Sequence, residues 1–404
     1  MKNLKEYIKE GLFDNIDELE GKKGLGSVVV VLKQDIIDWL CENCRRYLNG
    51  GARALSQSNI SVNMRTTPPT VNYNGSLSIT SKVSSLNNNG MFQWGKVKGD
   101  FHCDYCPSIK TLEGSPIEVG GSFYCNDCPS LESLEGAPKK VGGHFNCQYC
   151  PVLTSLEGGP EEVGGRFDCA YCENLKSLKG APKEVGGFYC QECNSLKTLE
   201  GAPKIINGDL NCSRCTSLES LGSTLDVVTG DFSGFGNVKL KSLKGSPKEV
   251  KEFTIWRCDS LTSLEGGPEK ATIYTCYNCK SLTTLKGAPK EVENTFDCSN
   301  TNIENLEGAP EKVSIMLCTE CSQLTSLKGC PHVTKSLYIN SCSNLKSLEY
   351  IPLHTKYAIY MYNTPIEDIG DLKKSKVYPI FGHSSCPAGE EIEEHFLNIR
   401  NGRQ

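Results

Sequence analysis

The chain has no long hydrophobic run and no large excess of either charge, and these absences exclude several classes of protein. Its longest purely apolar run, Val28 to Leu32, is far shorter than the ~18–20 residues that span a bilayer, so no transmembrane helix is expected. The 43 lysines and arginines nearly balance the 48 aspartates and glutamates, and a net charge of −5 argues against a protein that grips nucleic-acid phosphates. Residues 1–20 lack the apolar core of a secretory signal, and Lys2 excludes a myristoylation site. We therefore expect a cytoplasmic protein without a membrane or nucleic-acid partner.

Cysteine and glycine are abundant, with 23 and 39 residues in the 404. Without an export signal, the thiols are expected to stay mostly free in a reducing compartment. Buried cysteine behaves as a small, soft hydrophobic residue, so it can supply part of a core.

Most of the chain is one repeat of about 22 residues. Residues 123–144 read FYCNDCPSLESLEGAPKKVGGH and residues 145–166 read FNCQYCPVLTSLEGGPEEVGGR, which gives the unit F-x-C-x-x-C-x-x-L-x-x-L-x-G-x-P-x-x-V-G-G. Fourteen starts, 20 to 24 residues apart, are recognisable. They are Leu77, Phe101, Phe123, Phe145, Phe167, Phe188, Leu210, Phe232, Phe253, Tyr274, Phe296, Met316, Leu337 and Ile359.

A period of this length is too short for a pair of helices and suits one turn of a β-coil. The F-x-C segment alternates as a strand does, and the G-x-P and V-G-G segments have the residues of turns. Stacked copies would place Phe on Phe, Cys on Cys and Leu on Leu, which predicts that Phe145 and Leu156 are buried in the middle of the stack. The sequence therefore predicts a mainly β protein, a parallel β-solenoid of about 14 coils.

The pattern V-x-x-x-F-x-C-x-x-C-x-x-L-x-x-L resembles the leucine-rich repeat, with the second cysteine at the place of its Asn/Cys ladder. CPSLESL, CTSLESL, CDSLTSL and CKSLTTL are similar to the short repeats of bacterial surface-antigen-type proteins, and SLEGAPKEVGG resembles repeat proteins that tailed bacteriophages encode. This resemblance covers about 290 residues. It implies a leucine-rich-repeat-like solenoid whose default activity is protein recognition. The sequence departs from the usual pattern in having Cys where Leu normally follows Phe.

The two ends of the chain do not follow the repeat. We expect an N-terminal helical cap over 1–58, with helices from Leu4 to Leu12 and from Val28 to Leu48, and a connecting segment over 59–76. The solenoid is expected over 77–370. A C-terminal cap over 371–404 is expected to contain a short acidic helix from Pro387 to Arg400, with Ile392, Phe396 and Ile399 on one side.

The cysteine pairs are the most conspicuous candidate site. Cys103/Cys106 and Cys125/Cys128 match the spacing of a zinc site, but the repeat itself forces that spacing. Some coils also place Ile or Thr where a thiolate ligand would be needed, as at Ile255. We favour thiols packed in core and ladder positions, with zinc in some coils and disulfides as the alternatives. No metal site and no cofactor is predicted.

No catalytic constellation is evident elsewhere in the sequence. Cys41 and Cys44 lie one helical turn apart and could form a redox or metal pair, although packing on the first coil is the simpler interpretation. His383 and Cys386 could suggest a nucleophile and its base, but no partner motif accompanies them. We expect that the protein is not an enzyme.

The strand residues that point away from the core are more informative. In each coil the residue between Phe and the first Cys, and the residue after that Cys, face outward. Polar residues and aromatic residues mix there, which suits a protein recognition surface, although tyrosine also simply favours strands. The predicted partner-binding residues are Tyr124, Tyr189, Trp256, Tyr277, Tyr338, Tyr360 and Tyr362.

The main hypothesis is a non-enzymatic repeat scaffold, encoded by a phage, that binds a protein through this strand face. Residues 2–10 resemble the capsid-targeting leader of internal head proteins of T-even-like phages, so a structural virion component or packaged cargo is the first alternative. Carbohydrate binding through the same face is the second. The sequence names neither the partner nor the oligomeric state.

Overall fold

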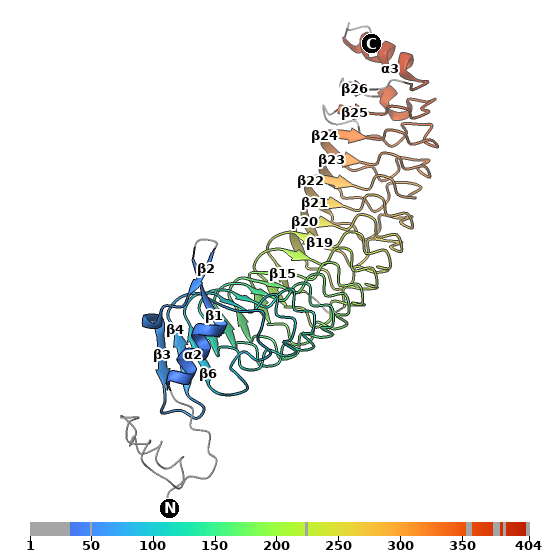
Figure 1. The fold of residues 1–404 in the computed structure, drawn as a ribbon. Coiled ribbons are helices and arrows are strands. Elements are labelled where there is room, and N and C mark those ends of the chain that lie inside the picture. Colours follow the sequence, from blue (N-terminus) through green and yellow to red (C-terminus); the bar gives the residue numbers. More distant parts are fainter. Residues whose placement is uncertain are drawn as a thin grey trace, which may run out of the picture. The chain divides into compact units, whose positions relative to one another are not determined.

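The computed structural model describes residues 33–48, 51–222, 225–352, 358–374, 380–382 and 385–400. The chain is mainly β and forms a parallel β-solenoid of about 13 turns, which confirms the predicted architecture and is close to the predicted number of coils. Two compact units are distinguished, one of residues 1–173 with 179–185 and one of residues 174–178 with 186–404. Figure 1 shows the coils following one another along each unit.

Unit 1 contains two parallel sheets, one from each side of its coils. The first consists of the strands that carry the Phe column, β5, β7, β9, β11 and β13, and the second of β4, β6, β8, β10 and β12, which carry the Val column. The elements of unit 1 are α2 (Lys33–Asn43), β1 (Cys44–Leu48), β2 (Gly51–Ala54), η2 (Gln57–Asn59), β3 (Ile60–Asn63), β4 (Thr70–Tyr73), β5 (Leu77–Ile79), β6 (Gln93–Val97), β7 (Phe101–His102), β8 (Glu118–Val119), β9 (Phe123–Tyr124), β10 (Lys140–Val141), β11 (Phe145–Asn146), β12 (Glu162–Val163), β13 (Arg166–Asp168) and β14 (Glu184–Val185).

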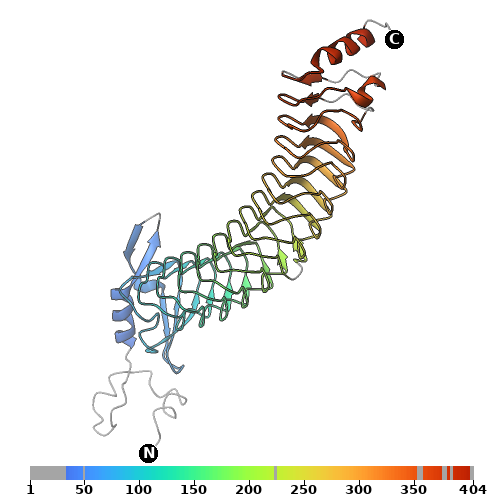
Figure 2. The same cartoon turned by 90° about the vertical axis from the view of Figure 1, so that its right-hand side faces the viewer.

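Unit 2 continues the same repeat, and its Phe-column strands pair in parallel from β15 to β26. From β20 to β24 the strands are longer, with six or seven residues each, and Figure 2 shows them as the long yellow to orange ribbons. Its elements are β15 (Gly187–Tyr189), β16 (Ile205–Ile206), β17 (Leu210–Asn211), β18 (Val227–Val228), β19 (Phe232–Ser233), β20 (Glu249–Thr254), β21 (Lys270–Thr275), β22 (Glu291–Asp297), β23 (Lys312–Leu317), β24 (His332–Tyr338), β25 (Ala358–Tyr360), η3 (Gly370–Lys374), β26 (Ile380–Gly382) and α3 (Gly389–Arg400).

The core consists of the columns that the repeat predicts. Phe145 and Leu156 are both fully buried, which confirms the register drawn from the sequence. Phe145 stacks on Phe123 with ring centroids 5.4 Å apart and on Phe167 at 5.1 Å. Each coil thus covers the ring of its neighbour, and the buried column runs without a break through the strands of the unit.

The predicted N-terminal helix from Val28 to Leu48 is too long. The helix α2 ends at Asn43, and Cys44–Leu48 forms strand β1 instead. This strand pairs antiparallel with β2 and with β5, the strand of the first coil. The hydrogen bonds offered by the open sheet edge outweigh the helical spacing of these residues, and β1 covers that edge. Residues 28–32 and the predicted helix from Leu4 to Leu12 lie outside the described residues.

The C-terminal helix is close to its predicted position, since α3 covers Gly389–Arg400. Ile392 on this helix is buried, as predicted. The Ala388 N–H just before the helix donates to the Ile366 carbonyl of the last coil at 2.8 Å, so this segment is attached to the solenoid. The side chains of Phe396 and Ile399 lie outside what the structure describes. Among the described residues, no helix combines the length and the hydropathy that crossing a membrane requires.

Candidate functional site

The second cysteine of each coil forms a ladder of hydrogen bonds along the stack. Its thiol donates to the main-chain carbonyl of the first cysteine in the preceding coil, as from Cys128 to Cys103 at 3.3 Å and from Cys342 to Cys318 at 3.0 Å. In the coil that begins at Ile359, Thr364 replaces the cysteine and its hydroxyl donates to the Ile339 carbonyl of the preceding coil at 2.6 Å. The position therefore requires a small buried hydrogen-bond donor, which is the ladder role that we predicted.

The ladder thiols do not all behave alike. Burial raises the pKa of Cys106 and the pKa of Cys128 from 9.0 to about 12, so the thiolate that metal binding and nucleophilic attack need is scarce at these two positions at neutral pH. The hydrogen bond with Cys342 instead lowers the pKa of Cys321. All 23 cysteines lie in the described residues, without a disulfide between them. No group of three or more His, Cys, Asp and Glu side chains in the described part of the chain is arranged to hold a metal ion.

The two other candidate pairs gain no support from the fold. Cys41 lies on α2, whereas Cys44 is the first residue of strand β1, so the two cysteines are not one helical turn apart. Burial raises the pKa of Cys44 far above its ordinary value. His383 lies outside the described residues, and Cys386 contacts Met361 and the Ile366 carbonyl of the last coil.

The outward-facing strand column combines two kinds of residue with different roles. Four of its polar members, in both units, use a carboxylate or amide oxygen to accept the N–H two residues later, and so close the turn that follows the strand. They are Asn146, Asp168, Asn211 and Asp297. Their polarity therefore has a structural cause. The recognition hypothesis accordingly depends on the aromatic members.

Three aromatic residues of unit 2 form a continuous stack, which we call the central aromatic stack: Phe235, Trp256 and Tyr277. The ring centroids of Phe235 and Trp256 are 4.5 Å apart with nearly parallel planes, and those of Trp256 and Tyr277 are 5.9 Å apart. The Arg214 guanidinium lies 5.5 Å from the Phe235 ring centroid and forms an ion pair with Glu192 at 3.2 Å. The stack is therefore held in place before any partner binds.

Phe235 was missed by the sequence analysis. In its coil Gly234 replaces the first cysteine and Asn237 replaces the second, so the C-x-x-C signature is absent. The buried Phe232 still marks the register, and counting three residues on from it would have placed Phe235 in the outward column. Asn237 keeps the ladder intact by donating to the Cys212 carbonyl at 3.1 Å.

A second group in unit 2, the C-terminal tyrosine group, contains Tyr338, Tyr360 and Tyr362. Tyr338 and Tyr360 stack with centroids 4.5 Å apart, and Tyr362 lies 6.3 Å from Tyr360. The two intervening coils, which begin at Phe296 and Met316, carry no aromatic residue at the outward positions. The five predicted binding residues from Trp256 to Tyr362 thus belong to two aromatic groups separated by two coils.

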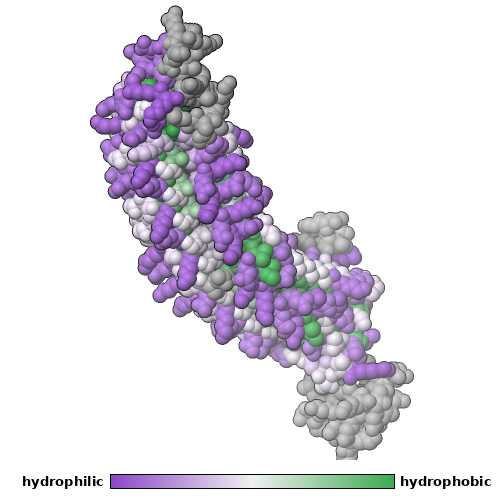
Figure 3. Space-filling view, turned by 180° about the vertical axis from the view of Figure 1, so that it is seen from behind, coloured by the Kyte–Doolittle hydropathy of each residue, from purple (hydrophilic) through white to green (hydrophobic). Residues whose placement is uncertain are grey.

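The remaining two predicted binding residues have local partners. Tyr124 in unit 1 stacks on His102 with ring centroids 4.5 Å apart. The Tyr189 hydroxyl in unit 2 donates to Asp209 at 3.2 Å. Neither residue belongs to one of the two aromatic groups. On the face shown in Figure 3, hydrophilic side chains cover most of the described surface and hydrophobic ones form small separate patches.

A comparison of the chain with known protein families, with curated proteins and with solved structures finds no match. The resemblance to short leucine-rich repeats therefore rests on the repeat motif alone, and no family is assigned.

Proposed function

We propose that the protein is a non-enzymatic repeat scaffold that binds a protein partner through the outward strand face of its coils. The observation that carries this proposal is the central aromatic stack. Trp256 and its neighbours are part-exposed, contribute nothing to the buried columns and are already ordered by mutual stacking. Aromatic anchors that lose little entropy on binding supply most of the energy in protein interfaces.

Carbohydrate binding is less well supported by the same residues. A sugar that packs on an aromatic ring needs an open ring face. In the central aromatic stack one face of Trp256 lies on the Phe235 ring and the Tyr277 ring is tilted beside it, and Tyr338 and Tyr360 cover one face of each other. The ring edges and the polar tips of these residues stay available, which suits contact with protein side chains and main chain. Residues 2–10, on which the virion alternative depends, lie outside the described residues.

The proposal is tested by removing one anchor from each aromatic group. Trp256→Ala combined with Tyr338→Ala should weaken capture of a partner at least tenfold, because central aromatic residues often contribute about 2 kcal/mol or more each. The thermal stability should change little, because neither side chain belongs to the buried columns. The measurement is affinity capture from a lysate, followed by a titration of the captured protein, once purified, against each variant.

Two controls separate this effect from a general loss of surface. Lys139→Ala with Lys140→Ala removes the side chains of a bend residue and of the first residue of β10, whose exposed ion pairs with Glu161 and Glu162 contribute little. Tyr350→Asn removes an exposed tyrosine in a turn of the same unit, at a left-handed position that Asn tolerates. Both controls should bind like the unchanged chain. Full binding by the aromatic double variant would overturn the proposal.

A further inference from the structure

A second surface lies at the corner where each coil turns after its F-x-C strand. The residue directly before the second cysteine occupies this corner, and in unit 1 these residues are Tyr105, Asp127, Tyr149 and Tyr171, which we call the corner row. Their φ angles lie between 54° and 60°, in the left-handed region. Main-chain hydrogen bonds join successive corners, from the Tyr105 N–H to Asn126 at 3.0 Å and from the Asp127 N–H to Gln148 at 2.9 Å. The backbone therefore holds the row in register.

The corner row presents aromatic rings to solvent with one position missing. Tyr105 is 62% exposed and Tyr149 is 46% exposed, although both are large aromatic side chains. Tyr149 and Tyr171 stack with ring centroids 4.5 Å apart and planes 7° apart. Tyr105 and Tyr149 are two coils apart, which corresponds to roughly 9.6 Å at the usual strand spacing. Asp127, between them, carries no ring, so one ring position of the row is unfilled, and we call this position between Tyr105 and Tyr149 the slot.

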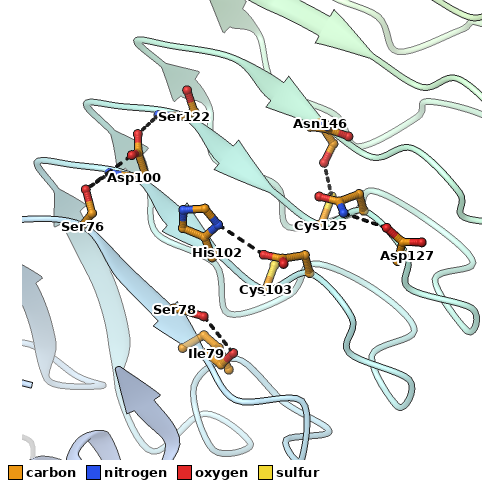
Figure 4. Close-up of polar contacts among 12 residues, drawn as sticks. Ser76, Ser78, Ile79, Asp100, His102, Cys103, Ser122, Cys125, Asp127 and Asn146 are labelled. Carbon is orange, nitrogen blue, oxygen red and sulfur yellow. Dashed lines mark hydrogen bonds and ion pairs between the residues drawn. The ribbon is translucent and has the colours of Figure 1, made fainter. Parts of the chain in front are cut away.

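The base of this slot is negatively charged. Asp127 lies at the turn that follows Cys125 (Figure 4), and its Oδ2 accepts a hydrogen bond from the Asn126 amide at 2.8 Å. Its Oδ1 has no hydrogen bond among the described residues. The pKa of the nearby Tyr149 phenol is raised, first by desolvation and by Tyr171. The negative charges of Asp127 and Asp168 raise this pKa further.

The other charged groups at these corners do not neutralise Asp127. Asp104, next to Tyr105, lies 3.3 Å from the His102 imidazole, and Asp168 forms an ion pair with Arg166 at 3.0 Å. Two aspartates and neither lysine nor arginine occur at the corner-row positions and the positions directly before them, 104–105, 126–127, 148–149 and 170–171. The chemistry of the slot is thus two aromatic side chains with a carboxylate between them.

We propose that this slot binds the guanidinium group of an arginine presented by the partner protein, between Tyr105 and Tyr149 and paired with the Asp127 carboxylate. A guanidinium is planar, stacks on aromatic faces, is more weakly hydrated than an ammonium and matches a carboxylate with two donors. A lysine ammonium lacks the planar face. The proposal rests on the proposed function in one respect, that the ligand belongs to a protein, and it uses none of the strand-face residues proposed to bind there.

The test uses the full chain with ¹³C-labelled tyrosine rings and a blocked pentapeptide, Gly-Gly-Arg-Gly-Gly, as the probe. The probe should shift the ring signals of Tyr105 and Tyr149 in NMR spectra and leave that of the exposed Tyr350 unchanged. The same peptide with lysine, or with uncharged citrulline, in place of arginine should bind at least tenfold more weakly. Equal shifts with lysine or citrulline would overturn the proposal, as would no shift with arginine.

Three variants make the test specific. Asp127→Asn keeps the shape and the left-handed backbone but removes the charge, and should weaken the arginine probe at least fivefold. Asp127→Tyr fills the slot with a ring and should abolish binding. The matched control is Glu320→Gln, the same charge change at the same repeat position in unit 2, with a φ of 56°. The proposal is wrong if Asp127→Asn and Glu320→Gln bind the probe alike.

The outcome is separable from that of the proposed function. Partner capture that depends on Trp256 and Tyr338 but not on Asp127 would leave the scaffold function standing and remove the arginine slot. If arginine binding depends on Asp127 but the aromatic double variant captures the partner normally, the arginine slot stands and the proposed strand-face function is wrong.

Discussion

The coils from β7 to β19 and those from β20 to β24 have the same buried columns but differ in how the chain approaches the Phe strand. In the first set, strands of two or three residues carry the Val and Phe columns separately, with a turn between them. In the second set, one strand of six or seven residues runs through both columns. The first set is referred to below as the two-strand coils and the second as the long-strand coils.

The sequence feature that separates the two sets is glycine after the Val column: the two-strand coils have it at the second position, as at Gly143, Gly208 and Gly230, and several have it at the first position as well, as at Gly142. In the two-strand coils Val141 is followed by Gly142 and Gly143, and a Cβ on Gly142 would lie 2.2 Å from the Gly120 carbonyl oxygen of the preceding coil. In the long-strand coils Val250 is followed by Lys251 and Glu252. A Cβ at the second of these positions would also meet the backbone of the preceding coil, as at Gly230, 2.7 Å from the Gly208 carbonyl carbon. The long-strand coils lack this glycine, and in them the strand continues through both columns while the core stays the same.

An open surface pocket of about 550 Å³ lies in unit 2 where one kind of coil is followed by the other. It is lined by Val227 and Val228 of β18 and by residues of β20 and β21. Among the described strands, β18 pairs with β16, whereas β20 pairs with β19 and β21. A main-chain hydrogen bond from the Lys251 N–H to the Gly230 carbonyl, 3.1 Å long, still connects the two coils there.

The largest expected difference between the two kinds of coil is in their response to alkaline pH. Burial raises the pKa of Cys106 and the pKa of Cys128 from 9.0 to about 12. A thiol whose pKa is higher in the folded state contributes stability that is complete below the unfolded pKa and is lost as the pH rises towards the folded pKa. Between pH 9 and pH 12 the folded state should therefore weaken, by about 1.4 kcal/mol per such thiol at pH 10.

The two-strand coils should lose their structure first, because they contain more cysteine. The six coils that begin at Phe101 to Leu210 hold 12 cysteines in the two columns, whereas the five long-strand coils hold 7. Hydrogen exchange measured by mass spectrometry with a reductant present, from pH 7 to pH 11, should show residues 101–215 losing protection at lower pH than residues 253–342. Loss of protection in the opposite order, or none by pH 11, would contradict this account of the thiol columns.

The sequence alone predicts the shared part of the two kinds of coil and little of the part in which they differ. Phe145 and Leu156 recur every 22 residues, so their burial could be inferred from spacing, and so could the ladder role of Cys128. These positions are fixed by contacts that each coil repeats with its neighbours. The end of α2 at Asn43 could not be inferred, because the pairing of β1 with the first coil decides it.

The candidate sites were predicted less completely than the core. Trp256 and Tyr277 were found because strand alternation marks them as outward, but Phe235 was lost with the cysteines of its coil. The corner row was missed altogether. Left-handed backbone is usually read from glycine, and Tyr105 and Tyr149 give no such signal.

The second prediction tests whether the glycine pair sets the path of the chain. Gly142→Ala should destabilise the protein by about 1–3 kcal/mol, because the new Cβ would force the Gly120 carbonyl and its coil apart. The control Lys251→Ala also introduces alanine, at the same repeat position of a long-strand coil, where the side chain is exposed. It should change the free energy of unfolding by less than about 0.5 kcal/mol. Urea denaturation measures both. Equal costs at the two positions would mean that the glycines are not what distinguishes the coils.

The smallest expected effect is a gain in stability, in the aromatic column of the long-strand coils. In the two-strand coils this column is almost all phenylalanine, whereas the long-strand coils contain Tyr274. Tyr274 is fully buried between Phe253 and Phe296, at centroid distances of 5.1 and 5.4 Å. Its hydroxyl oxygen is buried and has no hydrogen-bond partner among the described residues.

Tyr274→Phe should therefore stabilise the protein by about 1 kcal/mol, since it removes a buried polar group that pays for its desolvation without gaining a hydrogen bond. The reverse change, Phe296→Tyr, should cost about 1–3 kcal/mol for the same reason. The urea midpoint should rise for the first variant and fall for the second, at an unchanged denaturant slope. A fall in the midpoint with Tyr274→Phe would show that the hydroxyl has a partner, such as a buried water, beside Gly267, whose added Cβ would lie 3.2 Å from it. In that case the aromatic column of the long-strand coils, like that of the two-strand coils, would contain no buried polar group without a hydrogen bond. The two kinds of coil would then differ only in the path of the chain outside the core.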